Sequence, residues 1–486
     1  MLLSFTTASR GLAQASPYLP TDDPRMPLIE HLIARGDVRD PSPLERPFRK
    51  SDILAALSGS SNPVAIRLAA SLAPDRGASW IALSGRAGPQ AFTQGRKDLL
   101  HPGGKGSPGG YAELQVESVR GPIMLAGRLS LDTRLSHDPD YPESPFLLGD
   151  RSNLRVVDTY VGLQGRWGWI QLGQVARNWG PVGMPGIPLS DAAYPRPDIG
   201  VRLGRGLIRF SSIATNMKGS TNSSGEEIKR YFVAHRVTVS VGRGLTIAGW
   251  EVGIIAGTAN ELDGSTRAVV PLLVIPAVWA SRSHRNEMVG GDFSWKLSPR
   301  LRLEGQLAID DWNFDSNNPY PQRWAGSVSS AGPLGGTSSW RLSYTTASSL
   351  AFRTLNPEEN IVDQGIGIGR LFPDNEIVDL TVGIPVAETW LVAPRMALLR
   401  QGEGRIQTPF PSPTEAASTP SRFIGVTANS FWAGLAVSGG YQRLQVTGEG
   451  GLRHTSNAGH VAGRISTTLE GRVTATLGFA LRKVTQ

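Results

Sequence analysis

Residues 301–309 read LRLEGQLAI, a stretch in which apolar and polar positions alternate. Leucine, isoleucine and one glycine occupy the odd positions, whereas Arg302, Glu304 and Gln306 occupy even positions. Successive side chains of a β-strand point to opposite faces. This stretch therefore predicts a strand with one apolar face and one charged face.

The same alternation recurs along most of the chain. It is present in Gly121–Leu135, Asp158–Gln174, Val201–Ser211, Arg236–Glu251, Met288–Leu297, Ser339–Ala347, Phe431–Val446, Arg464–Leu469 and Arg472–Arg482. In a soluble sandwich the apolar face is the core and the polar face meets solvent, whereas in a membrane barrel the apolar face meets lipid and the charged face lines the lumen. Periodicity alone does not separate these two classes.

Segment lengths favour the membrane barrel. The alternating runs are about 9–11 residues long, which suits a tilted membrane-spanning strand. Short turns such as Leu297–Arg300 and Val241–Gly244 alternate with long polar segments such as Met217–Lys229 and Glu403–Ser421. We therefore predict a closed antiparallel outer-membrane β-barrel of about 18 strands over residues 76–486, with a soluble multi-domain β protein as the alternative.

Tryptophans near the expected strand ends are typical of the aromatic belts of membrane proteins. These residues are Trp167, Trp169, Trp250, Trp295, Trp312, Trp340, Trp390 and Trp432.

The N-terminal part differs from the rest. Residues 16–75 have helical periodicity, clearest in Met26–Arg35 (MPLIEHLIAR), which Gly36 can terminate. We predict a small helical module there, on the periplasmic side. Residues 1–15 resemble the end of a secretory signal, and an unstructured cytosolic N-terminus is the alternative.

Composition excludes several classes of function. The chain has 486 residues, a formal net charge of +8 and no cysteine, so disulfide scaffolds and cysteine-ligated metal sites are excluded. No stretch reaches the ~18 apolar residues of a membrane helix. The basic residues are dispersed, so nucleic acid is not an expected partner.

One segment stands out between two expected strands. Residues 177–197 read RNWGPVGMPGIPLSDAAYPRP, with five prolines and three glycines. Proline removes hydrogen-bond donors and fixes φ, so the segment is neither a helix nor a ladder strand. We predict that it folds into or across the lumen and is held there by Arg177, Trp179, Ser190 and Asp191. A structural plug and a ligand site remain open as its role.

The same segment resembles the capsule assembly Wzi family. The resembling pattern is Arg177, Trp179-Gly180-Pro181 and Gly183, followed by Leu189-Ser190, Ala192, Pro195 and Pro197. Tyr18–Asp52, Asn286–Trp295 and Gln306–Trp312 also resemble blocks of that family. The resemblance implies an outer-membrane β-barrel with a periplasmic helical module at its base. It also implies lectin-like binding of capsular or related polysaccharide at the cell surface.

Catalytic constellations are not apparent. Asp310 and Asp311 are adjacent in a strand and so point to opposite faces, which does not suit paired acid–base work. With Trp312 they predict either a rim that binds a sugar or Ca²⁺, or a plain strand-to-loop turn. The seven histidines form no metal-ligand pattern.

The lumenal arginines are candidates for selecting an anionic ligand, or for structural pairing with carboxylates. They are Arg128, Arg166, Arg177, Arg202, Arg209, Arg236, Arg302 and Arg341.

We therefore expect a non-catalytic, monomeric protein of the bacterial outer membrane that binds and organises surface polysaccharide. An outer-membrane porin or substrate-specific channel is the alternative. Surface polysaccharide and outer-membrane lipid are the expected partners, polysaccharide export machinery is a further candidate, and no cofactor or metal is expected. The ligand-binding or lumen-structuring candidates are Arg177, Trp179, Ser190, Asp191, Tyr194, Asp310, Asp311 and Trp312.

Overall fold

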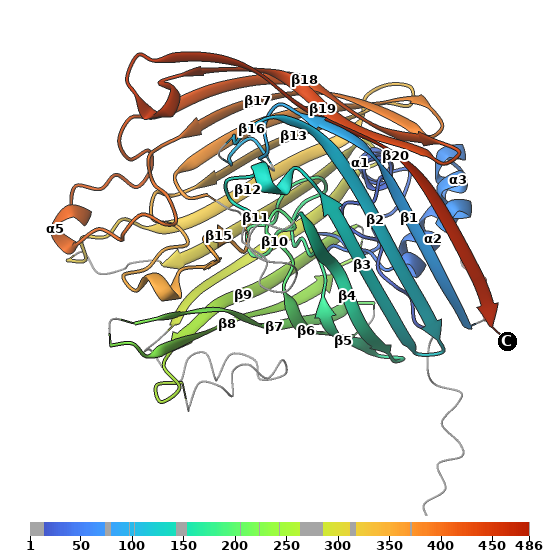
Figure 1. Cartoon of the computed structure of the whole chain (residues 1–486), viewed down its shortest axis with the longest axis horizontal. Helices are drawn as coiled ribbons and strands as arrows, with labels where there is room; N and C mark the ends of the chain where they lie inside the picture. The colour runs from blue at the N-terminus through green and yellow to red at the C-terminus, as the bar shows by residue number, and fades with distance from the viewer. Residues whose placement is uncertain are drawn as a thin grey trace, which may run out of the picture.

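The computed structural model is a closed antiparallel β-barrel of 18 strands, shut by the pairing of its first strand with its last (Figure 1). It describes residues 14–72, 79–96, 98–101, 103–141, 153–204, 206–222, 224–242, 244–262, 285–311, 317–369 and 372–485. The first nine strands are β1 Ser79–Phe92, β2 Ser107–Arg120, β3 Ile123–Asp132, β4 Leu154–Gln164, β5 Gly168–Gln174, β6 Pro197–Leu203, β7 Ile208–Thr221, β8 Glu227–Ser240 and β9 Leu245–Gly257. The others are β10 Arg285–Ser298, β11 Leu301–Asp311, β12 Arg323–Pro333, β13 Ser339–Ala347, β16 Asn375–Ala387, β17 Trp390–Gln401, β18 Ala428–Tyr441, β19 Leu444–Ser456 and β20 Ile465–Thr485. The predicted fold class is confirmed.

The two faces of each strand separate as the alternation requires. On β11, Leu307 lies on the outer surface and is 53% exposed, whereas Glu304 points into the lumen and is 2% exposed. Leu125, Leu477 and Leu481 are likewise more than half exposed on the outside. A folded chain leaves such an apolar belt exposed to water only at a cost, so the belt suits lipid.

The two ends of the barrel differ. One end, here the short-turn end, carries the tight connections between β2 and β3, β4 and β5, β6 and β7, β8 and β9, β10 and β11, β12 and β13, β16 and β17, and β18 and β19. The opposite, long-loop end carries the extended connections, among them residues 175–196, 348–374 and 402–427. The barrel begins and ends at the short-turn end, because β1 starts there and β20 finishes there. In outer-membrane barrels the short turns are periplasmic.

Three helices form the N-terminal module at the short-turn end (Figure 1): α1 Met26–Arg35, α2 Lys50–Ser58 and α3 Pro63–Leu72. Gly36 ends α1 in the left-handed conformation, as the sequence predicts. The module has its own apolar core, which includes Ile29, Phe48 and Leu57. It is also tied to the wall: the ring of His31 bonds the Ser339 hydroxyl at 2.7 Å and the Thr337 carbonyl oxygen at 3.1 Å.

Several expectations from the sequence were wrong. Most of 217–229 is strand rather than loop, because β7 continues to Thr221 and β8 begins at Glu227. Many strands have 13 or 14 residues rather than about 9–11.

The predicted aromatic belt forms only in part. Trp167, Trp295, Trp340 and Trp390 lie at strand ends on the short-turn end and are exposed or half-buried, whereas Trp169, Trp250 and Trp432 are buried. Trp250 lies on the inward face of β9, where it packs in a buried apolar cluster that includes residues of the 175–196 connection. Trp312 and residues 1–13 of the expected signal lie outside the described residues. Among the described helices, none has the length and apolar character needed to cross a membrane.

Candidate functional site in the lumen and at the long-loop end

Residues 175–196, which we call the lumen-crossing segment, leave β5 and return to β6. At its start, Arg177 pairs with Asp198 on β6, and one bond joins Arg177 Nη2 to Asp198 Oδ1 at 2.8 Å. The segment then doubles back on itself, because the Trp179 amide donates to the Leu189 carbonyl oxygen at 2.9 Å. Its four prolines carry no N–H, which lowers the number of backbone donors that must be satisfied there.

The far wall of the barrel completes the hydrogen bonding of this segment. Glu304 Oε2 accepts from the Val182 amide at 3.0 Å, and Gln306 Oε1 accepts from the Ile187 amide at 3.1 Å. The Gln306 amide group in turn donates to the Trp179 carbonyl oxygen at 2.7 Å. The charged face of LRLEGQLAI is thus the hydrogen-bond partner of the segment, which the alternation alone does not reveal.

Trp179 is the apolar anchor of the segment. Its side chain is 2% exposed and packs in a cluster that includes Ile187, Leu189, Phe232 and Trp250.

A buried ion pair lies beside Trp179. The Arg236 guanidinium lies 5.7 Å from the Trp179 ring centroid and bonds both oxygens of Asp292, at 2.6 and 2.8 Å. Both charged side chains are fully buried, so this part of the lumen is filled.

Ser190, Asp191 and Tyr194 belong to the part of the segment that lies near the long-loop end of the barrel. The Ser190 amide donates to the Ile368 carbonyl oxygen at 3.1 Å, and the Ser190 hydroxyl accepts from the Ala192 amide at 3.1 Å. Asp191 is half-buried in the same turn.

Tyr194 is the centre of a small group of side chains, here the Tyr194 cluster. The Tyr194 hydroxyl donates to Asp138 Oδ2 at 3.1 Å, Tyr141 meets its ring edge-to-face at 5.0 Å, and the Arg155 guanidinium lies 5.2 Å from its centroid. Burial, and then the Asp138 carboxylate, raise the pKa of Tyr194, so the phenol stays protonated and acts as a donor. Tyr194 and Tyr141 are half-buried.

Asp310 lies near a second aromatic group, to which Arg323 connects it. Its Oδ2 accepts from the Phe352 amide at 2.9 Å and lies 3.9 Å from Arg323 Nη1. This placement gives Asp310 a clear structural role. Asp311 ends β11 opposite Arg323, and Trp312 lies outside the described residues.

Above Asp310, the guanidinium groups of Arg323 and Arg353 lie 5.5 and 5.7 Å from the Phe410 ring, and Tyr320 lies 5.2 Å from it. We call these four residues the Phe410 cluster. Sequence reasoning missed Tyr320, Arg353 and Phe410, since they lie in connections without periodicity, and only the proximity of Tyr320 to the Asp310 block was a signal.

The predicted lumenal arginines mostly pair with carboxylates. Arg128 bonds Asp158 and Asp22, and Arg202 lies 3.5 Å from Glu45 of the N-terminal module. Burial alone raises the pKa of Glu45, but the nearby Arg202 and Arg209 lower this pKa to about 2.

Arg302 likewise lies 3.5 Å from a carboxylate, that of Glu304. Arg341 differs, because it bonds the lumen-crossing segment rather than a carboxylate. Arg166 is not in the lumen: it lies over Trp167 in the exposed turn between β4 and β5.

The lumen is filled unevenly. Along β8–β11 the inward charges are buried, as Arg236 and Asp292 show. Along β17–β20 several inward charges are accessible: the side chains of Arg472, Arg395 and Glu449 are 45%, 30% and 26% exposed. Water can therefore reach one side of the lumen. Within the described part of the chain, no group of three or more acidic or histidine side chains is placed to hold a metal ion.

Comparison with solved structures identifies similar folds. The chain is similar to Wzi, described as an outer-membrane protein involved in group 1 capsule assembly in Escherichia coli and a carbohydrate-binding β-barrel. That match has a TM-score of 0.62 and 15% identity, and covers 96% of this chain and 99% of that one. Pseudomonas aeruginosa OprD matches at a TM-score of 0.45 and 9% identity over 83% of this chain and 95% of that one. Acinetobacter baumannii OccAB4 matches at a TM-score of 0.46 and 8% identity over 83% of this chain and 98% of that one. A search of family models and of curated proteins finds no match. At these identities the likeness concerns the fold.

Proposed function

We propose that this protein is a non-catalytic β-barrel of the bacterial outer membrane that binds and organises surface polysaccharide. The observation that carries the proposal is the pair of half-buried aromatic groups at the long-loop end, the Tyr194 and Phe410 clusters. Both lie beside segments that occupy the lumen.

The chemistry of the two clusters suits a glycan. Aromatic faces pack against apolar C–H surfaces, while arginine and carboxylate groups bond hydroxyls or acidic substituents. Each cluster offers both: Tyr194 and Tyr141 lie beside Arg155 and Asp138, and Phe410 lies beside Arg323. The carbohydrate binding stated for the similar Escherichia coli barrel supports the same class of ligand.

Membrane location is part of the proposal. The apolar belt, the asymmetry of turns and loops, and the module at the short-turn end all fit a barrel whose long loops face outward. The fold likeness to outer-membrane proteins supports it.

A deletion strain tests this function. Loss of the gene should release surface polysaccharide into the medium, and Tyr194→Ala should reproduce part of that release while keeping normal heat-modifiable mobility. Tyr441→Ala is a matched control, because Tyr441 is 67% exposed in the barrel wall at the opposite end. Unchanged retention in the deletion strain, together with no binding on a glycan array, contradicts the proposal.

A channel is the second candidate function. The accessible charges of Arg472, Arg395 and Glu449 favour it, because they leave part of the lumen wet. Planar-bilayer recordings of the purified protein separate the two: steady ion conductance supports the channel, and its absence supports the binder.

A further inference from the structure

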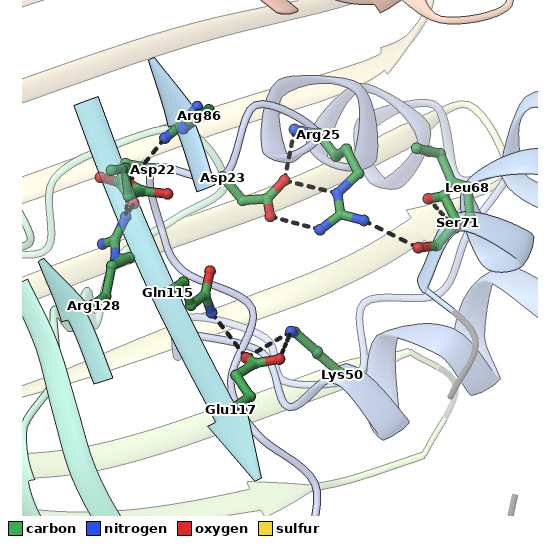
Figure 2. Close-up of polar contacts among 11 residues, drawn as sticks. Asp22, Asp23, Arg25, Lys50, Leu68, Ser71, Arg86, Gln115, Glu117 and Arg128 are labelled. Atoms are coloured by element: carbon green, nitrogen blue, oxygen red, sulfur yellow. Dashed lines mark hydrogen bonds and ion pairs between the residues drawn. The ribbon is translucent and has the colours of Figure 1, made fainter. Parts of the chain in front are cut away.

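A cavity of about 790 Å³ lies at the short-turn end, between the N-terminal module and the wall formed by β1, β2 and β20. Its volume is within the range of about 300–1,000 Å³ that small-molecule sites occupy. From the module it is lined by residues that include Asp23, Arg25 and Lys50, and from the wall by Arg86 and Glu117. Figure 2 shows these side chains converging from the segment before α1, from α2 and from two strands.

Internal pairing fixes the walls of this cavity. Asp23 accepts from Arg25 Nη2 at 2.7 Å, and Arg25 Nη1 also donates to the Ser71 carbonyl oxygen at 3.3 Å (Figure 2). Lys50 Nζ bonds Glu117 at 2.6 and 2.7 Å, and the Gln115 amide donates to Glu117 at 2.9 Å. The carboxylates are thus already engaged.

Protonation of Asp23 does not weaken this arrangement near neutral pH. Burial alone raises the pKa of Asp23, but the adjacent Arg25 guanidinium lowers this pKa to about 2.

Positive charge exceeds negative charge in the lining. The cations are Arg25, Lys50, Arg86, Arg128, Arg443 and Arg482, against the carboxylates Asp23, Glu113 and Glu117. Two of the cations come from the ends of neighbouring strands: Arg443 lies in the turn between β18 and β19, and Arg482 lies near the end of β20, where its guanidinium is 4.7 Å from the Trp80 ring centroid. Both are exposed, so an incoming anionic ligand meets them readily.

The lining also offers uncharged hydrogen-bonding groups, among them Ser84, Gln115 and Gln445. The Oε1 atom of Gln445 is buried and accepts no hydrogen bond from the described residues. A buried acceptor without a partner costs free energy, which a ligand hydroxyl can recover.

We propose that this cavity binds a short stretch of an acidic polysaccharide at the short-turn end of the barrel. Arg443 and Arg482 bond the carboxylate substituents of the sugar, and Gln115 and Gln445 bond its hydroxyls. The inference rests on the proposed glycan-binding function and adds to it a second site, on the opposite end from the Tyr194 and Phe410 clusters, with a preference for uronic-acid-type sugars.

Calorimetry on the full chain in detergent tests this site, with tetragalacturonate, neutral maltotetraose and inorganic phosphate as probes. The wild type should bind tetragalacturonate more tightly than either of the other two. Arg443→Gln/Arg482→Gln should weaken its binding about tenfold or more, since two charge-assisted hydrogen bonds are lost. Arg443→Lys/Arg482→Lys should retain most of the affinity. Arg120→Gln/Arg300→Gln removes equal charge at the same end, outside the cavity lining, and should change nothing.

Each other outcome has a definite meaning. Unchanged affinity in Arg443→Gln/Arg482→Gln, or no binding of tetragalacturonate by the wild type, overturns the cavity site. Phosphate binding as tight as that of tetragalacturonate also overturns it, in favour of a small-anion site. If only Tyr194→Ala weakens glycan binding, the proposed function stands and this inference fails. If the deletion strain retains its polysaccharide and the array shows no glycan, the proposed function fails, whereas the cavity is judged by calorimetry alone.

Discussion

Arg341 on β13 donates a hydrogen bond of 3.0 Å to the carbonyl oxygen of Val182, although β13 lies eight places from β5 in an 18-stranded order. The bond therefore reaches almost straight across the lumen. Gly183 permits it, because its φ is +67° and any Cβ there would collide with the Arg341 guanidinium. The lumen-crossing segment is thus held at both walls, by Asp198 on β6 and by Arg341 on β13.

Removing the crossing should open the lumen. Replacing residues 181–188 with a short Gly-Ser linker removes Val182 and Ile187, which contact Glu304, Gln306 and Arg341, so we expect single-barrel conductance to rise several-fold over the wild type. Arg341→Ala should give a smaller, fluctuating increase. Arg400→Ala serves as the control, since Arg400 pairs with Glu376 and lies away from the segment. Equal conductance in all four proteins contradicts occlusion by the segment.

Trp179→Ala should destabilise the barrel. The side chain is 2% exposed, and truncating a buried aromatic residue of this size costs about 3–5 kcal/mol. We expect a lower denaturation midpoint in detergent and slower appearance of the heat-modifiable form. Trp167→Ala, at a 65% exposed turn position, should be nearly neutral. Normal stability with lost glycan retention in Trp179→Ala indicates instead that the residue contacts the ligand.

The Arg236–Asp292 pair should show strong coupling. Breaking a buried pair on one side leaves an uncompensated charge, so Asp292→Ala or Arg236→Ala alone should each lose about 3–5 kcal/mol. The double variant Arg236→Met/Asp292→Leu should lose less than either single change, because no buried charge remains. Equilibrium denaturation in lipid vesicles measures the free energy of unfolding of each protein in this double-mutant cycle. Additive losses would show that the two side chains act independently.

The attachment of α1 should depend on pH through His31. Burial, and then the nearby Arg35, lower the pKa of His31 to about 4 from an ordinary value near 6.5. The unfolded chain therefore takes up the proton first as the pH falls. The stability contributed by neutral His31 is complete above about pH 6.5 and is lost progressively down to about pH 4. Denaturation midpoints measured from pH 7.5 to pH 4 should therefore decrease as the pH drops through this window.

His31→Gln keeps one donor and one acceptor for Thr337 and Ser339 without titrating, so its midpoint should vary less over the same window. His454→Gln, on the exposed face of β19, should follow the wild type. A pH profile of His31→Gln that matches the wild type rules out this residue as the titrating group.

Local pattern determined the architecture. In LRLEGQLAI the period of two sets which side chains face outward, since the pleat leaves each residue only two directions. Repetition of that pattern, with the lengths of the runs, was sufficient for a barrel of about 18 strands. Helical periodicity was sufficient for α1, and the density of proline for the irregular path after β5.

Only the tertiary structure determined which partners the inward-facing side chains contact. Sequence shows that Gln306 points away from lipid, but its partner Trp179 is 127 positions away, and only closure of the barrel brings them within 2.7 Å. The same holds for Trp250, whose apolar neighbours in the lumen come from another part of the chain. The cavity between the N-terminal module and β20 is lined by residues from both ends of the sequence, and no local pattern predicts that these parts lie next to each other. Alternation fixes direction because it is set by each residue's own backbone, whereas pairing across the lumen depends on which distant strand stands opposite.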